Sequence, residues 1–320
     1  KVLIYRFLKL KKVIYISGGV GGAKFAKGLN KIEDIDLTIL VNTGDDEHIH
    51  GVFLSPDIDT VIYNLAGIEG EFGWGIKNDK FTVNNELRKY YDLDFKIGDR
   101  DLATNLYRSQ MISQGETLTE ITKNIKNKFE LNCEIIPMSD DRVSTKLITK
   151  NNKKLDFQEY FVEKKGKPRI KNIIYEGSRV AKVNQNTINK IKSSDIVIIG
   201  PSNPLLSVGP ILSLGKLKKE LISHENVTII SPFIDKDAIK GPSKKNFEDI
   251  GFSPDIEGIK KYYKNIGKKY IVHFGDSDKK INTVEENILF KTIKDSESLA
   301  RKILNYEWSN NYSNIWVTWS

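Results

Sequence analysis

Four aspartates between residues 45 and 59 carry the clearest chemical signal in this chain. Asp45 and Asp46 are adjacent, and Asp57 and Asp59 lie two residues apart. Carboxylates supply the hard oxygen ligands that Mg²⁺ prefers, and they repel one another unless a cation compensates their charge. Helix caps and Asx turns also use acids in such positions, and we expect one of the four to act as a cap. Together with the glycine-rich turn that precedes them, the aspartates favour metal-assisted phosphoryl transfer.

A glycine-rich segment, GGVGG at 18–22, precedes these acids. It follows a strand-like run at 13–16 and leads into a helix expected from Ala23. Glycine lets the backbone approach a ligand closely, and a helix N-terminus attracts anions. The segment is not a Walker A loop, because Lys24 follows Ala23, and Lys24 also occupies the third glycine position of G-x-G-x-x-G. A phosphate-binding turn and a plain strand-to-helix turn both fit.

Three later segments place polar groups beside predicted elements. GPSNP (200–204) follows a strand-like run, and Ser202 and Asn203 can bind phosphate or a heteroaromatic edge, or simply form a crossover turn. Residues 240–242 (KGP) present a lysine in another turn. GDRD (98–101) opens a helix, where an acid–base pair is usually structural although Arg100 could reach a phosphate. His48 and His50 are expected to be surface or hydrogen-bonding residues in preference to metal ligands.

Strand-like and helical patterns alternate along the chain. Short β-branched runs occur at 13–16, 37–41, 133–137, 196–199, 227–230 and 270–272, and helical patterns occur at 23–29, 102–114, 118–128 and 211–221. This alternation predicts an α/β fold with a Rossmann-like, doubly wound and mainly parallel sheet. Ligands bind at the carboxyl ends of the strands in such sheets, and the motifs lie at those ends.

We expect a single Rossmann-like domain over residues 11–320, preceded by an N-terminal extension at 1–10. Strand-like segments at 145–149 and 157–162 are separated by a polar turn, which predicts a small inserted α/β or β-meander lid at about 140–180. A closing helix is expected at 296–308. Trp308, Trp316 and Trp319 are interpreted as packing or interface residues.

Composition argues against several classes of protein. The 320 residues carry a net charge of +8, but the lysines are spread along the chain without a compact basic-aromatic cluster, so nucleic-acid binding is not expected. The single cysteine, Cys133, excludes an internal disulfide framework and fits a cytoplasmic setting. No apolar run approaches the ~18 residues of a membrane span, and no membrane partner is expected.

In combination, the motifs resemble the 2-phospho-L-lactate transferase family (CofD/FbiA-like) of coenzyme F420 biosynthesis. The resemblance rests on SGGVGGAK (17–24), VNTGDD (41–46), SPDIDT (55–60), GDRDLAT (98–104), GPSNP (200–204), SVGP (207–210) and KGP (240–242), in the family's order. Two departures stand out. Ser55 replaces the usual cysteine, and Ser243-Lys244-Lys245 follow Pro242 where Ala-Asp-Lys is expected.

The resemblance implies a Mg²⁺-dependent homodimer that acts on small molecules. Its members transfer a 2-phospholactyl or phosphoenolpyruvyl group from a guanosine diphosphate conjugate to the deazaflavin Fo (7,8-didemethyl-8-hydroxy-5-deazariboflavin). The products are GMP and coenzyme F420-0 or its dehydro form. The resemblance also implies catalytic roles for Asp45, Asp46 and Asp59, with Asp46 and Asp59 holding the metal. Asp45 or Asp57 is the candidate acceptor of the hydroxyl proton.

Candidate substrate-binding residues come from all of these motifs. They are Gly18, Gly19, Gly21, Gly22, Lys24, Asn42, Asp57, Thr60, Asp99, Arg100, Thr104, Ser202, Asn203, Pro204, Ser207, Lys240, Gly241 and Pro242.

Two other classes share part of the pattern. A related regulatory protein that binds a nucleotide-sugar or dinucleotide without catalysis would have the same fold and glycine turn. The GDRDLAT and 57–59 segments favour the enzyme over that alternative. A Rossmann oxidoreductase is disfavoured, because the glycine fingerprint is broken and no acidic residue clearly ends the second strand as a ribose ligand.

Overall fold

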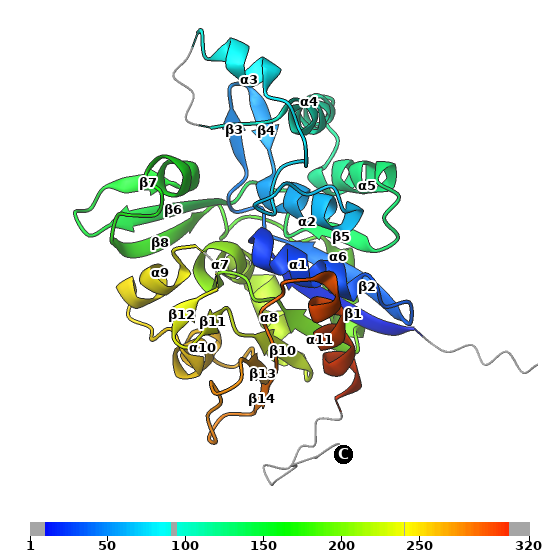
Figure 1. Ribbon diagram of the computed structural model, residues 1–320, viewed down its shortest axis with the longest axis vertical. Helices are drawn as coiled ribbons and strands as arrows, with labels where there is room; N and C mark the ends of the chain where they lie inside the picture. Colours follow the sequence, from blue (N-terminus) through cyan, green and yellow to red (C-terminus); the bar gives the residue numbers. More distant parts are fainter. Residues whose placement is uncertain (1–9, 91–94, 240, 307–320) are drawn as a thin grey trace, which may run out of the picture.

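A parallel β-sheet forms the centre of the molecule (Figure 1). The computed structural model describes residues 10–90, 95–239 and 241–306. Seven parallel strands lie in the order β14 (Thr283–Glu285), β13 (Lys269–Val272), β10 (Val227–Ile230), β9 (Ile196–Ile199), β1 (Lys11–Ser17), β2 (Ile35–Val41) and β5 (Glu134–Pro137). The chain extends from β1 to β5 on one side and then adds β9 to β14 on the other. This order confirms the predicted doubly wound fold and makes the β1/β9 boundary its switch point.

Six of the seven strands coincide with the β-branched runs predicted from the sequence. Both faces of these strands are covered over most of their length, so their buried residues are mainly apolar. The sequence did not predict β14, because its three residues are only half-buried at the sheet edge and form no apolar run.

Alternate side chains of β1 face two separate helical layers. Val13 and Tyr15 pack in the cluster formed with α1 (Gly19–Leu29), α2 (Pro56–Ala66), α5 (Leu118–Lys128) and α11 (Ile293–Asn305). Ile14 and Ile16 pack in the opposite cluster with α6 (Gln185–Ser193), α7 (Gly209–Ser213), α8 (Gly215–Ser223), α9 (Ser243–Asp249) and α10 (Ile256–Tyr263). The core therefore consists of two apolar layers, one on each side of the sheet.

The predicted single helix at 211–221 is wrong. The structure divides it into α7 and α8, because Leu214 adopts an extended conformation with φ −76° and ψ 100°. Leu214 is buried, and Gly215, a poor residue for a helix interior, follows it. The predicted helices at 23–29, 102–114 and 118–128 correspond to α1, α4 (Asp99–Ser113) and α5.

A small antiparallel sheet lies beside the main sheet (Figure 1). It contains β6 (Ser144–Thr149), β7 (Lys154–Asp156) and β8 (Ile170–Glu176), in the order β7-β6-β8. The predicted strand at 157–162 is wrong, since the chain turns there into a helical segment that includes η1 (Glu159–Glu163). Phe157 and Phe161, four residues apart, stack with ring centroids at 5.4 Å, which is a helical spacing.

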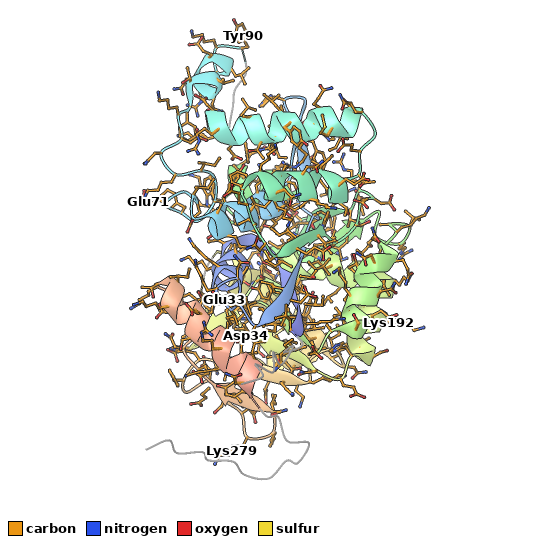
Figure 2. All side chains as sticks on the ribbon, turned by 90° about the vertical axis from the view of Figure 1, so that its right-hand side faces the viewer. Glu33, Asp34, Glu71, Tyr90, Lys192 and Lys279 are labelled. Carbon is orange, nitrogen blue, oxygen red and sulfur yellow. The ribbon has the colours of Figure 1, made fainter. Side chains whose placement is uncertain are left out.

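Two excursions extend above the carboxyl edge of the sheet (Figure 1). One is the hairpin of β3 (Glu47–Ile49) and β4 (Val52–Leu54), and the other is α3 (Thr82–Leu87) with α4. The short strands β11 (Phe233–Ile234) and β12 (Asp237–Ala238) form a smaller hairpin. Figure 2 shows Tyr90, beyond α3, and Lys279 at opposite ends of the long axis.

Helix α11 is the last described element of the chain. Helix α11 covers most of the expected closing helix, while Trp308, Trp316 and Trp319 lie outside the described residues. The extension at 1–10 and the boundaries of the inserted subdomain stay predictions. Within the described ranges, no helix combines the length and apolar character needed to cross a bilayer.

Candidate active site

Three neighbouring strands bring three predicted motifs to one edge of the sheet. In the strand register, Ser17 of β1 pairs with Val41 of β2, and Ile16 pairs with Ile199 of β9. The loops that begin at Gly18, Asn42 and Gly200 therefore start side by side. Helix α2 follows the β3–β4 hairpin and brings the second pair of aspartates to the same edge.

Asn42 joins the two pairs of aspartates. Its Nδ2 donates to Asp45 Oδ1 at 2.7 Å and to Asp57 Oδ2 at 2.9 Å. The amide of Gly44 donates to Asn42 Oδ1 at 2.8 Å, which is consistent with the side-chain NH₂ facing the carboxylates. All three side chains are buried. Asn42, Asp45 and Asp57 thus form one polar cluster from residues up to 15 positions apart.

The glycine turn packs directly against this cluster. Gly19 N donates to Asp57 Oδ1 at 2.7 Å, and Gly18 N donates to Ser202 Oγ at 3.3 Å. Asp57 therefore accepts from a backbone donor at the start of α1, although it is not the N-cap residue of α1 or of its own helix α2. A Cβ at Gly21 would lie 2.8 Å from the Pro201 carbonyl oxygen. The glycines thus permit close packing against the loop after β9, in addition to any ligand contact.

Ser55 holds Asp46 on the other side of the site. Its hydroxyl lies 2.9 Å from Asp46 Oδ1 and 2.8 Å from Asp46 Oδ2, and both residues are buried. Ser55 directly precedes α2, so this contact fixes the loop after β2 to the start of that helix. Serine at this position has a clear structural role as a donor to the carboxylate.

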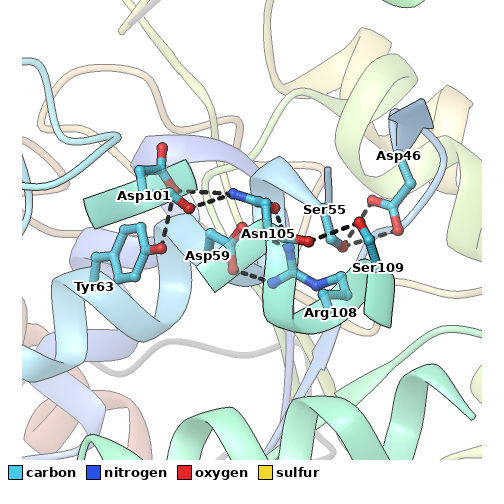
Figure 3. Close-up of polar contacts among 8 residues, drawn as sticks. All are labelled: Asp46, Ser55, Asp59, Tyr63, Asp101, Asn105, Arg108 and Ser109. Carbon is cyan, nitrogen blue, oxygen red and sulfur yellow. Dashed lines mark hydrogen bonds and ion pairs between the residues drawn. The ribbon is translucent and has the colours of Figure 1, made fainter. Parts of the chain in front are cut away.

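Arg108, which the sequence analysis missed, pairs with Asp59 (Figure 3). Its guanidinium donates from Nη1 to Asp59 Oδ2 at 3.1 Å and from Nη2 to Asp59 Oδ1. The Arg108 side chain is fully buried. Arg108 Nη1 also donates to Asn105 Oδ1, and Asn105 Nδ2 lies 3.2 Å from Asp101 Oδ1. These contacts make α4 a wall of the site.

The spacing of polar residues along α4 could have revealed this wall from the sequence. Asp101, Asn105 and Arg108 are spaced at i, i+4 and i+7 and therefore lie on one face of α4. The GDRDLAT block drew attention only to the beginning of that helix. The Tyr63 hydroxyl, on α2, completes the network by donating to Asp101 Oδ1 at 2.9 Å.

Burial makes the carboxylates of the site costly to ionise. It raises the pKa of Asp45 well above its usual range, and repulsion from Asp57 and Asp46 adds to this. Burial also raises the pKa of Asp46, against the hydrogen bond from Ser55 and the charge of Arg108. The pKa of Asp57 is raised to about 6 by burial. For Asp59, burial raises the pKa while Arg108 opposes the rise.

The donor set fits a hard divalent cation. The four buried carboxylates lie near enough to repel one another, and a cation would relieve this repulsion. Among the described residues, no three His, Cys, Asp or Glu side chains are grouped as a ready-made metal site. Mg²⁺ is commonly held by one or two carboxylates together with substrate phosphates, so this arrangement is compatible with such binding. The assignment to Asp46 and Asp59 stays a prediction.

The loop after β9 contains further predicted residues, which lie against the glycine turn. Ser202 accepts from the glycine turn, and a Cβ at Gly18 would lie 2.6 Å from Ser207 Cβ. Asn203 Oδ1 accepts from the amides of Leu205 and Leu206 and so caps η2 (Pro204–Val208). The Pro204 carbonyl accepts from Tyr262. A Cβ at Gly22 would lie 2.5 Å from Ser202 Oγ.

Other predicted residues have local partners elsewhere. Asp99 accepts from the amides of Thr82 and Val83, and Arg100 Nη1 contacts the carbonyl of Lys77. Thr104 is half-buried on α4, Thr60 is buried on α2, and Lys24 is exposed on α1.

The second lysine-containing turn is described only in part. Gly241 has φ +68°, and Pro242 packs against Gly166. Lys240 lies outside the described residues. His48 is exposed on β3 and makes an edge contact with Phe53 at 5.0 Å, as expected for a surface histidine.

The fold and this edge define an α/β protein with an acidic site at its topological switch point. The family model described as 2-phospho-L-lactate transferase CofD matches residues 13–304. The chain is 36% identical over 304 residues to the 2-phospho-L-lactate transferase of Methanocaldococcus jannaschii, covering 92% of this chain and 97% of that protein. It is 35% identical over 302 residues to the enzyme of that name from Methanopyrus kandleri, covering 92% and 96%. The chain therefore belongs to the CofD family of 2-phospho-L-lactate transferases and is an enzyme of the transferase class.

Solved structures agree with this fold. A crystal structure of a UPF0052 family protein from Bacillus halodurans superposes with a TM-score of 0.64 at 14% identity, and it covers 92% of this chain and 100% of that chain. A second crystal structure of the same Bacillus protein gives a TM-score of 0.63 at 15% identity over the same shares. At this identity the likeness concerns the fold alone.

Proposed function

We propose that this protein transfers a 2-phospholactyl group, or its phosphoenolpyruvyl counterpart, from a guanosine diphosphate conjugate to the deazaflavin Fo. The products are GMP and coenzyme F420-0 or its dehydro form. The single observation that carries the proposal is the match to the transferase family over residues 13–304, which includes every element of the acidic site. The site's chemistry is consistent with it, because buried carboxylates at a switch point suit metal-assisted phosphoryl transfer.

The reaction is a displacement at phosphorus. The terminal ribityl hydroxyl of Fo forms a new P–O bond to the phosphorus that carries the three-carbon acid. The bond from that phosphorus to the GMP oxygen breaks, and GMP leaves with the bonding electron pair. The hydroxyl proton passes to a carboxylate, for which Asp45 and Asp57 are the candidates. Positioning and charge stabilisation supply most of the acceleration in reactions of this kind.

Mg²⁺ is the proposed cofactor, with Asp46 and Asp59 as the residues that would hold it and Asp45 beside them. When bound, the cation would neutralise the diphosphate and the charge that develops on GMP. The chain's own contribution is rigid placement. Ser55 orients Asp46 and Asn42 orients Asp45. These hydrogen bonds limit the reorganisation needed when substrates bind.

The substrates are proposed to occupy the three converging loops. The glycine turn and the loop containing Ser202 and Ser207 would face the phosphates, since α1 directs the positive end of its dipole toward this edge. Residues 240–242 would lie near the nucleotide. We further propose that the protein is a homodimer, as the resemblance implies.

A direct assay tests this function. Purified protein is incubated with Fo, Mg²⁺ and either the lactyl or the enolpyruvyl guanosine diphosphate conjugate, and GMP is followed by chromatography. The expected result is formation of GMP and a phosphorylated deazaflavin in equal amounts with one of the donors. If the folded protein forms neither product from either donor, the proposed function is wrong.

A further inference from the structure

We propose that Arg108 is a positioning residue for the transfer reaction, acting through Asp59. The inference rests on the proposed function and extends it to a residue outside the predicted site. Arg108 lies on α4, 49 positions from its partner in the sequence, and its side chain has no exposed surface. A fully buried arginine is rare unless its charge is paired.

The contact between the two side chains is bidentate. Nη1 donates to Asp59 Oδ2 at 3.1 Å while Nη2 donates to Oδ1. Such a fork fixes the plane of the carboxylate as well as its position. Lysine would keep the positive charge, but it would lose this two-point geometry.

A closed network immobilises the guanidinium itself (Figure 3). Arg108 donates to Asn105, Asn105 donates to Asp101, and Asp101 accepts from Tyr63. Tyr63 lies one turn beyond Asp59 on α2, so the chain of contacts leaves α2, crosses α4 and returns to α2. Side-chain contacts thereby hold the first turn of α2 against α4.

Charge gives Arg108 a second effect on the site. Its positive charge stabilises ionised Asp59 and, at longer range, ionised Asp46. Asp45 and Asp57 add two more buried carboxylates to the same edge. Arg108 therefore offsets part of the negative charge from one side and leaves the opposite side of the cluster to the ligand. Its removal would both free Asp59 to rotate and increase repulsion among the acids.

The test separates positioning from stability with three variants. Arg108→Lys keeps the charge and loses the fork. The double variant Asp59→Asn with Arg108→Met removes both charges, so no unpaired buried ion is left. Arg169→Lys is a control for the Arg-to-Lys change at an ion pair outside the site, since Arg169 pairs with buried Asp249 on α9 while its own side chain is 57% exposed. Thermal unfolding, kcat, the KM for Fo and Mn²⁺ binding without substrates are measured for each.

If Arg108 positions Asp59, the Arg108→Lys protein is folded, its kcat falls at least 30-fold, and its KM for Fo changes less than threefold. The double variant lacks the proposed metal ligand Asp59 and is expected to lose at least 100-fold of kcat whatever the role of Arg108, so it serves to show that the fold survives loss of the pair. A purely structural role for Arg108 predicts near-normal kcat in the folded fraction of Arg108→Lys, and a kcat within threefold of wild type in that variant would overturn the proposal. Arg169→Lys is expected to match wild type, and an equal loss of kcat there would also overturn it.

Failure of the proposed function gives a different result, because the wild-type protein itself would then release no GMP. In that case Mn²⁺ binding tests the role of Arg108, and it is measured by the electron paramagnetic resonance signal of the free ion. At least fivefold weaker binding by Arg108→Lys, with unchanged binding by Arg169→Lys, supports positioning of Asp59. Equal binding by wild type and Arg108→Lys, including no binding by either, overturns it.

Discussion

The side-chain amide of Asn42 lies 2.9 Å from Oδ2 of Asp57 and so joins the loop after β2 to the first turn of α2. The other oxygen of Asp57 accepts from Gly19, at the start of α1. One carboxylate therefore connects the two motifs that stand out first in the sequence. The glycine turn and the aspartates form a single unit, and disturbing one is expected to disturb the other.

Replacing Asn42 with leucine tests this unit. Asn42→Leu removes the donor shared by Asp45 and Asp57 and leaves two buried carboxylates short of a hydrogen bond. We expect a loss of about 3 kcal/mol in the free energy of unfolding, the upper part of the range for an unsatisfied buried group. Urea denaturation measures it. Asn189→Leu, on the exposed face of α6, is expected to stay within about 0.5 kcal/mol of wild type. Equal stability of the two variants would contradict the role given to Asn42.

Gly21 is expected to tolerate no side chain. An alanine Cβ there would lie 2.8 Å from the carbonyl oxygen of Pro201, a backbone atom that cannot move aside cheaply. Gly21→Ala should destabilise the protein by about 1–3 kcal/mol, as overpacking does elsewhere. Gly215→Ala is the matched control, because its Cβ would meet nothing within 4 Å at the start of α8. Equal unfolding temperatures of Gly21→Ala and Gly215→Ala would contradict this prediction.

Asp101 is expected to make stability depend on pH. Burial and the nearby charge of Asp59 raise its pKa from 3.8 to about 7, despite the hydrogen bond from Tyr63. Because the folded state favours the protonated acid, its stabilising contribution is complete below about pH 4 and is lost as the pH rises to 7. The difference in free energy of unfolding between wild type and Asp101→Asn should thus fall by up to about 4 kcal/mol over this range.

Asp99 provides the control of opposite sign for that experiment. Backbone hydrogen bonds from Val83 and Thr82 lower its pKa, so its contribution should be lost as the pH falls. Chemical denaturation at pH values from about 2.5 to 7 compares Asp101→Asn and Asp99→Asn with wild type, and the loss at Asp99 is expected mainly below its ordinary pKa of 3.8. A wild-type advantage over Asp101→Asn that grows with pH would show that the sign assigned to Asp101 is wrong.

The fold was largely predictable because a parallel sheet buried on both faces needs apolar, β-branched strands. The runs at 13–16 and 196–199 could be recognised without knowledge of their neighbours, and strand–helix alternation then implied the layers. At 157–162 a strand was predicted although the aromatic residues have the spacing of a helix. Phe157, Tyr160 and Phe161 are spaced as on a helix face, and the buried Tyr160 hydroxyl donates to the Gly166 carbonyl at 3.0 Å.

The candidate site was predictable where its chemistry is local in sequence. The aspartates and the glycine turn follow strand ends, and strand ends in such sheets meet at one edge. Arg108 was missed because its partner is 49 residues away and the contact depends on how α4 packs against α2. Asn42 was included among the binding residues, but its bridging position between Asp45 and Asp57 could come only from the three-dimensional arrangement.

The most direct test of the account is GMP release by aspartate variants at the acidic site. Asp46→Asn and Asp59→Asn are compared with wild type and with Asp36→Asn, an exposed change near the opposite end of β2. All four proteins are first checked for folding by circular dichroism and thermal unfolding, and each is then assayed with Fo, Mg²⁺ and the guanosine diphosphate donor. We expect Asp36→Asn to match wild type, and we expect both site variants to remain folded while releasing GMP at least 100-fold more slowly. Full activity in both site variants would contradict it.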